Sequence, residues 1–129
     1  MKTLGILICI IGMSLTSCNE QSVSGQDLIK NEIPCNLNNE VRREVTSENG
    51  VIEYRKTLDK YFIKVVPAGH IDTVIFGSVC NLPEELKLNN LKVTFSGQYF
   101  EQPEKMPTTF VGHEYYDLNL TAYKVTEPN

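Results

Sequence analysis

The sequence predicts an all-β domain with one short helix, and three observations carry this prediction. Apolar and polar residues alternate along Leu91–Phe100, which is typical of a strand that buries one face. Val, Ile and Phe are frequent in Ile71–Cys80, as in a buried strand. Helix-start signals are confined to the short segment around Glu84.

The first predicted element is a β-hairpin. Asn49 and Gly50 form a strong turn signal, because a type I′ turn needs positive φ at both central residues. The turn separates two predicted strands, Val41–Thr46 and Val51–Thr57.

The next two predicted strands are more apolar. Tyr61–Val66 forms the first of them, and the segment Pro67–His70 breaks the pattern. Ile71–Cys80 then reads as a buried strand.

The single predicted helix follows. Asn81 is able to cap its start, and Pro83 fits the first turn. Leu86 and Leu88 are expected to face the core, in a helix of about one or two turns.

Two longer strands close the domain. Gly97 lies inside the predicted strand Leu91–Phe100, where a glycine often marks a bulge or a barrel bend. A long loop, Glu101–Gly112, leads to the last strand, Tyr115–Val125. Alternation in this strand predicts the inward side chains Tyr116, Leu118, Leu120 and Ala122.

The order of these elements resembles the OB-fold, which has a helix between its third and fourth strands. The resemblance covers about residues 51–125 and implies a small five-stranded, partly open barrel. The alternative is a small β-sandwich with Val41–Thr46 as an additional edge strand.

The amino terminus carries a targeting signal. Lys2 precedes the apolar stretch Leu4–Met13, which is too short to span a bilayer comfortably. The following tetrapeptide Leu15–Cys18, Leu-Thr-Ser-Cys, resembles the lipobox of bacterial lipoproteins. This resemblance implies diacylglycerol on the Cys18 thiol, cleavage before Cys18, and lipid anchoring at the outer membrane or surface of a Gram-negative envelope. The alternative is an ordinary secretory signal in which Cys18 is a bystander.

The chain is therefore expected to have three parts. Residues 1–17 are the signal peptide, residues 18–32 a lipidated flexible tether, and residues 33–129 a single β-rich domain. The tether is assigned because Asn19–Lys30 is polar and lacks periodicity.

Charge excludes one class of partner. The net charge of −4 becomes −5 when Lys2 leaves with the signal, and nucleic acids select clustered Lys and Arg instead. Glutamates flank the only adjacent basic pairs, Arg42-Arg43 and Arg55-Lys56. Both pairs are expected to lie on solvated faces.

Two cysteines remain once Cys9 leaves with the signal and Cys18 carries lipid. Cys35 and Cys80 are an even pair in an oxidising compartment, which favours a disulfide between them. Two separate buried thiols, or a catalytic thiol, are the alternatives.

No catalytic motif is recognised in the sequence, which contains neither a Gly-x-Ser-x-Gly elbow nor a Gly-rich phosphate loop. We therefore expect a non-enzymatic binding module without a cofactor or a metal. His70 and His113 each follow a glycine and precede a carboxylate. A small metal-binding protein or hydrolase that uses these two histidines is one alternative.

The predicted contact surface lies around the long loop before the last strand. Aromatic side chains on an OB-like barrel commonly bind sugars, peptides or proteins. We expect Tyr99 and Tyr116 to belong to the core. The residues expected to bind a protein or glycan partner are Pro103, Pro107, Phe110, His113 and Tyr115.

Two further hypotheses concern the loops. Either Val111-Gly112-His113 or Ala68-Gly69-His70 could serve as the extended loop of an inhibitor of a secreted cysteine protease. Asp72-Thr73-Val74 resembles an O-glycosylation sequence of secreted proteins in some Gram-negative bacteria, and a chance match is the alternative.

Overall fold

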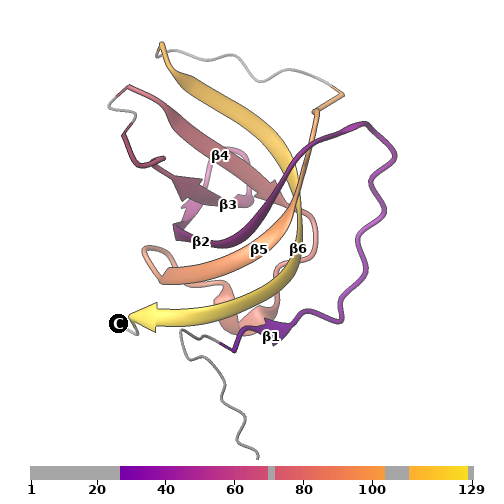
Figure 1. Cartoon of the computed structure of the whole chain (residues 1–129), viewed down its shortest axis with the longest axis vertical. Helices are drawn as coiled ribbons and strands as arrows, with labels where there is room; N and C mark the ends of the chain where they lie inside the picture. The colour runs from indigo at the N-terminus through magenta and orange to yellow at the C-terminus, as the bar shows by residue number, and fades with distance from the viewer. Residues whose placement is uncertain (1–26, 70–71, 104–110, 128–129) are drawn as a thin grey trace, which may run out of the picture.

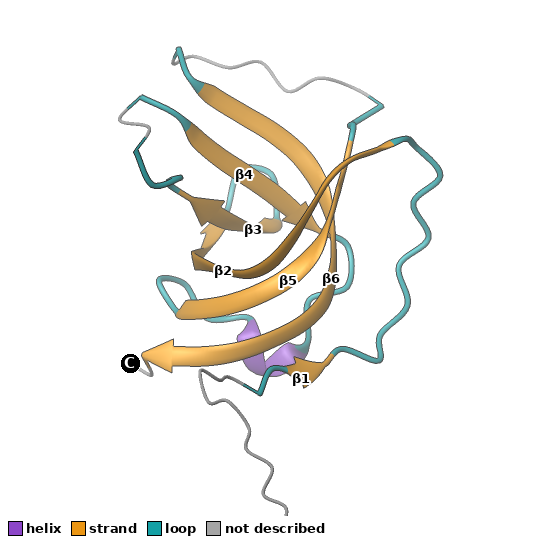
Figure 2. Cartoon of the chain, viewed as in Figure 1, coloured by secondary structure: helices purple, strands orange, loops and turns teal. Residues whose placement is uncertain are grey.

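A computed structural model describes residues 27–69, 72–103 and 111–127 (Figure 1). Within these ranges the chain is almost entirely β-strand, with one short 3-10 helix (Figure 2). This confirms the predicted fold class. The elements are β1 Ile29–Lys30, β2 Val41–Arg55, β3 Lys60–Val65, β4 Val74–Val79, η1 Glu84–Leu86, β5 Lys92–Phe100 and β6 His113–Glu127.

The strands from β2 to β6 close into a ring. β2 pairs antiparallel with both β3 and β5, and β3 pairs antiparallel with β4. β6 pairs antiparallel with β5 and parallel with β4, which closes the barrel. With η1 between β4 and β5, this is the connectivity of the OB-fold that the order of elements predicted.

The predicted hairpin at Asn49 and Gly50 is wrong. Both residues lie inside β2, a continuous strand that pairs with β5 over most of its length and with β3 at its end. A Cβ atom at Gly50 would lie 2.5 Å from Cγ2 of Ile63, so glycine is needed here for close packing across the barrel. Val41–Thr46 is part of β2, and the structure therefore does not have the separate edge strand of the sandwich alternative.

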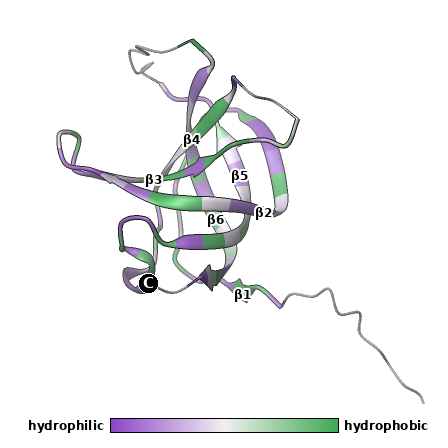
Figure 3. Ribbon diagram, turned by 90° about the vertical axis from the view of Figure 1, so that its left-hand side faces the viewer, coloured by the Kyte–Doolittle hydropathy of each residue, from purple (hydrophilic) through white to green (hydrophobic). Residues whose placement is uncertain are grey.

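Apolar side chains from η1 and from strands β2 to β6 fill the barrel. Figure 3 shows hydrophobic and hydrophilic bands alternating along the strands, as expected when one face points inward. The most completely buried members of this core are Ile52, Ile63, Ile75, Leu86, Val93, Phe95, Tyr99, Leu118 and Leu120.

The helix is shorter than expected. Pro83 occupies the N-cap position without a side-chain cap, and the single 3-10 turn ends at Leu86. Leu86 is fully buried as predicted. Leu88 lies beyond the helix and is 54% exposed, so its predicted place in the core is wrong. Asn81 does not cap the helix, because its side chain bonds Ile33, Asn119 and Leu120.

Gly97 marks a bulge, as predicted. The register between β5 and β6 shifts between Ser96 and Gly97, and a Cβ atom at Gly97 would lie 2.5 Å from the carbonyl oxygen of Asn119. The shift changes which side chains of β6 face inward. Beyond it the buried core residue is Tyr123, in place of the predicted Ala122.

Residues 31–40 join β1 to β2 along the outside of the barrel, and we call this segment the strap. Its start is fixed because the Asn31 amide donates to the carbonyl oxygens of Leu120 at 2.8 Å and Asn81 at 3.0 Å. The predicted disulfide between Cys35 and Cys80 fastens its middle, with the two Cα atoms 5.8 Å apart.

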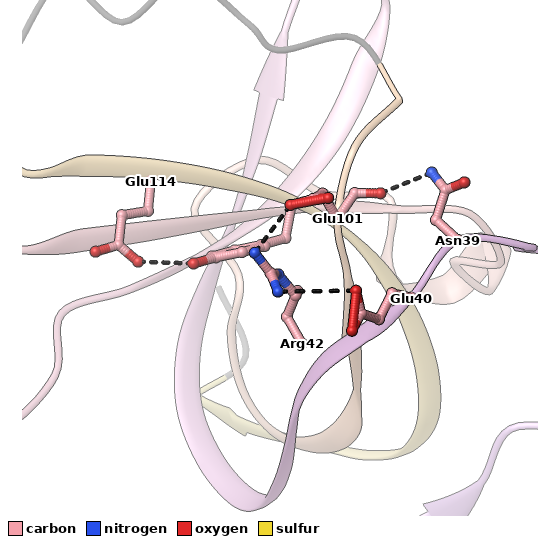
Figure 4. A network of polar contacts seen from close by, with 6 residues as sticks. Asn39, Glu40, Arg42, Glu101 and Glu114 are labelled. Atoms are coloured by element: carbon pink, nitrogen blue, oxygen red, sulfur yellow. Dashed lines mark hydrogen bonds and ion pairs between the residues drawn. The ribbon is translucent and has the colours of Figure 1, made fainter.

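The end of the strap is held by polar contacts (Figure 4). The Asn39 amide donates to the carbonyl oxygen of Glu101 at 2.7 Å, and Arg42 pairs with the Glu101 carboxylate at 3.0 Å. β1 also pairs with β6 through Ile29 and Lys30. Two residues of the predicted tether are therefore paired with the sheet.

Across the described ranges, no helix is long and apolar enough to span a membrane.

Candidate functional site

A second group of aromatic side chains lies on the outer face of the barrel. Side chains alternate between the two faces of a strand, so Ile63 and Ile75 enter the core while Phe62 and Phe76 point outward from β3 and β4. Tyr115 on β6 is opposite Phe76 in the parallel pairing. The outer aromatic cluster consists of Arg55, Phe62, Phe76, His113 and Tyr115.

The rings of this cluster pack in definite geometries. Phe76 and Tyr115 are stacked, with their centroids 4.9 Å apart and an interplanar angle of 13°. Phe62 meets both rings edge-on, at 6.3 Å from Phe76 and 6.1 Å from Tyr115. His113 lies 5.2 Å from Phe76. Such edge-to-face and stacked pairs stabilise the arrangement beyond simple burial.

Arg55, at the end of β2, lies over this ring cluster. Its guanidinium carbon is 4.5 Å from the Phe76 centroid, 5.1 Å from that of Phe62 and 5.3 Å from that of Tyr115. Phe62 is 0% exposed and Phe76 is 3% exposed, although both lie outside the main core. Arg55 thus contacts apolar rings with its planar face while a quarter of its side chain stays exposed.

Two hydrogen bonds fix the guanidinium in place. Nε of Arg55 donates to Oε2 of Glu53 at 2.7 Å, and Nη1 donates to the Tyr115 hydroxyl at 2.8 Å. Burial acts to lower the pKa of Arg55, but these two hydrogen bonds outweigh it and the pKa is raised. The guanidinium is therefore charged at every physiological pH.

A groove adjoins the cluster, between the barrel and the strap. Its volume is about 470 Å³, and Ile33 and Leu37 of the strap form part of its wall. On the barrel side it is lined by Lys60, Ser78 and Asp117 among others. Ser78 is the neighbour of Phe62 in the β3–β4 pairing, and Asp117 follows Tyr115 on the same face of β6, so the groove and the cluster are continuous.

The structure brings together only some of the predicted site residues. His113 and Tyr115 belong to the cluster, but they lie within β6 and not in a loop. Pro103 is exposed beyond the end of β5 and is not a member of the cluster. Pro107 and Phe110 lie outside the described residues.

The alternative metal site depends on His70, which also lies outside the described residues. Among the residues that the structure does describe, no group of three or more His, Cys, Asp or Glu side chains is placed to hold a metal ion. Asp72 is exposed and Thr73 half-buried, directly before β4.

Three members of the cluster are not predicted by the sequence. Arg55 is expected on a solvated face because Glu53 lies nearby, and this expectation is wrong because its planar face covers aromatic rings. Phe62 and Phe76 are expected in buried strands, but not on a second apolar face. One feature of the sequence could have predicted this second face. Two large apolar residues are adjacent in each strand, Phe62-Ile63 in β3 and Ile75-Phe76 in β4, so apolar side chains occur on both faces of these strands.

No protein-family model matches this chain, and no curated protein is similar enough to count as a relative. The function must therefore be inferred from the site itself.

Proposed function

We propose that this protein is a lipid-anchored binding module of the cell envelope, which acts on a protein or glycan partner by binding and not by catalysis. The observation that carries the proposal is the outer aromatic cluster, whose rings and arginine lie outside the main core. It is built on β2, β3, β4 and β6, and β3 and β4 correspond to the face on which OB-folds bind ligands.

The composition and rigidity of the cluster support binding. Tyrosine and arginine are enriched among the residues that dominate interface energies. Tyr115 and Arg55 are partly exposed, while stacking and hydrogen bonding hold both side chains in one arrangement. A side chain that is already ordered loses little conformational entropy when a partner binds.

The placement of the cluster suits a membrane-anchored protein. The described chain enters the barrel at β1, which pairs with Ala122 and Tyr123 near the end of β6, whereas His113 and Tyr115 lie at its start (Figure 1). With lipid on Cys18, the anchored end and the cluster would thus lie at opposite ends of β6. The cluster would be presented away from the membrane.

Partner capture from envelope extracts of the native cells tests this proposal. We expect the immobilised full chain to retain a discrete protein or glycan, and Tyr115→Ala to reduce the amount retained at least about tenfold. Lys124→Ala, on the exposed far part of β6, is the matched control. Equal capture by all three proteins, at melting temperatures that show them to be folded, would refute the binding role of the cluster.

The anchor has its own test. Fatty-acid labelling of cells that express the wild-type chain or Cys18→Ala should give label only in the wild type. Undiminished label in the variant would contradict lipidation at Cys18.

One observation favours a second candidate function, inhibition of a secreted cysteine protease. Val111 is 98% exposed immediately before Gly112, which has a φ of 90°. An exposed apolar residue beside a glycine suits contact with a protease cleft. Inhibition of a panel of secreted cysteine proteases that is lost in Val111→Asp would support this role, and no inhibition of any of them would remove it.

A further inference from the structure

We propose that the ligand of this face is an acidic peptide segment: a peptide carboxylate binds the free edge of the Arg55 guanidinium, and a neighbouring apolar side chain enters the groove beside the strap. This inference rests on the proposed function, whose partner it specifies.

The carboxylate site follows from the donors that Arg55 leaves unused. Its bonds to Glu53 and Tyr115 occupy Nε and one N–H of Nη1. Within the described part of the chain, the Nη2 group and the second N–H of Nη1 have no partner. These remaining N–H groups belong to both Nη atoms of the planar guanidinium, and two such donors match the two oxygens of a carboxylate.

The surroundings of this edge favour an anion. Lys60 lies directly opposite Arg55 in the β2–β3 pairing and forms no ion pair with another described residue. Two cations, Arg55 and Lys60, are therefore adjacent at this edge, and Glu53 is the one described carboxylate that forms an ion pair with either of them. The two carboxylates that line the groove each accept a hydrogen bond, Asp59 from Tyr54 at 2.7 Å and Asp117 from Gln102 at 3.3 Å.

The groove favours a peptide over an acidic sugar. Ile33 of the strap is 44% exposed, and with Leu37 and Leu82 it gives the groove an apolar wall. A leucine-sized side chain would remove this wall from water, whereas the hydroxyl groups of a sugar would lose hydrogen bonds to water against it. Arg55 and the groove together thus select a carboxylate next to an aliphatic side chain.

Two small probes test this assignment on the full chain in detergent micelles. N-acetyl-Leu-Glu-amide carries the required pair of groups, and N-acetyl-Leu-Gln-amide differs only in lacking the charge. We expect the acidic probe to shift the NMR signals of the Arg55 side-chain N–H groups and of the Ile33 and Leu37 methyl groups. The affinity for the neutral probe should be at least about tenfold weaker.

Two arginine variants test whether binding needs the planar donors of Arg55 or only its positive charge. Arg55→Lys keeps the positive charge but loses the planar donors, so it should weaken binding of the acidic probe about tenfold. Arg42→Lys, whose arginine pairs with Glu101 on another part of the surface, should leave the affinity unchanged. Because the two probes are first compared on the wild type, the inference can be refuted even if a variant fails to fold.

Three outcomes would overturn the inference. Equal shifts with both probes would show that the charge is irrelevant. A second outcome is that glucuronic acid shifts the Arg55 signals at least as strongly as the acidic probe does and leaves the Ile33 and Leu37 signals unchanged. That result would identify an acidic sugar as the ligand. If neither probe shifts Arg55 while envelope capture still depends on Tyr115, the peptide inference fails and the proposed function stands; if capture also fails, both fail.

Discussion

At the scale of single residues, Arg55 shows how a charged side chain can complete an apolar cluster. Its guanidinium covers Phe62 and Phe76. In this position the guanidinium loses hydrogen bonds to water, and its hydrogen bonds to Glu53 and Tyr115 compensate for that loss. Arg42, by contrast, forms ion pairs with Glu40 and Glu101 at the surface, and exposed ion pairs contribute little to stability.

This difference predicts unequal effects of two matched variants. Arg55→Ala uncovers two buried rings and removes charge-assisted hydrogen bonds, so it should lower the free energy of unfolding by about 2 kcal/mol. Arg42→Ala should change it by no more than about 0.5 kcal/mol. Urea denaturation measures both values, and equal effects would show that the contacts of Arg55 add nothing to stability.

A second residue pair predicts how stability depends on pH. The Tyr123 hydroxyl donates to Glu85 at 2.6 Å. This hydrogen bond, together with burial, raises the pKa of Tyr123 from 10.0 to about 12. The folded state therefore holds the phenolic proton more tightly, and the stabilisation is complete below pH 10 and lost as pH rises from 10 to 12.

The same hydrogen bond lowers the pKa of the Glu85 carboxyl from 4.5. Its stabilisation is therefore complete above pH 4.5 and is lost as pH falls through the lowered value. Tyr123→Phe should remove both pH dependences, as measured by the difference in unfolding free energy between variant and wild type across pH. A difference that stays constant from acid to alkaline pH would contradict this coupling.

Residue identity predicts the outer face only in part. Tyr115 and His113 can be found from sequence because aromatic residues crowd the last third of the chain. Arg55, Phe62 and Phe76 cannot, because they meet only through the pairing of β2, β3, β4 and β6. Strand propensity gives no information about such pairings between distant segments.

At the scale of elements, β2 explains the main error of the sequence prediction. Asn49 and Gly50 carry the local signal of a turn, yet the strand runs through them and pairs with β5 on both sides of the glycine. Glycine is required at position 50 because the Ile63 side chain on β3 lies close to it. This is a tertiary contact, and the turn signal in the neighbouring residues does not predict it. The bulge at Gly97 was predictable because a glycine inside an alternating strand commonly marks one.

The strap is the element that depends most on covalent chemistry. Cys35–Cys80 closes a loop of 45 residues, and the rest of the strap is held by a few hydrogen bonds. Reduction should lower the free energy of unfolding by about 3–4 kcal/mol in the chain-entropy model.

Thermal unfolding with and without reductant measures this loss. The double variant Cys35→Ser, Cys80→Ser is the control, since reductant should not destabilise it further. An unchanged melting temperature after complete reduction, verified by mass, would show that packing alone holds the strap.

At the scale of the whole molecule, the order of elements was the most informative part of the sequence. Three strands, a short helix and two further strands predicted the barrel even though one turn was misplaced, because the connectivity depends on order and not on exact boundaries. The polar sequence around Ile29 gives no sign that this residue pairs with β6.

The whole fold separates two apolar clusters, one inside the barrel and one outside it. The inner cluster fills the barrel, whereas the outer cluster covers the face formed by β3, β4 and β6. The central claim is that this outer face contacts a partner in the cell.

Photocrosslinking in the native cell tests that claim most directly. Benzoylphenylalanine is introduced in place of His113, at the edge of the cluster, or in place of Lys124, on the exposed far part of β6. Our account predicts a discrete crosslinked product at position 113 and none at position 124. Products of equal yield at both positions, or a product only at position 124, would contradict it.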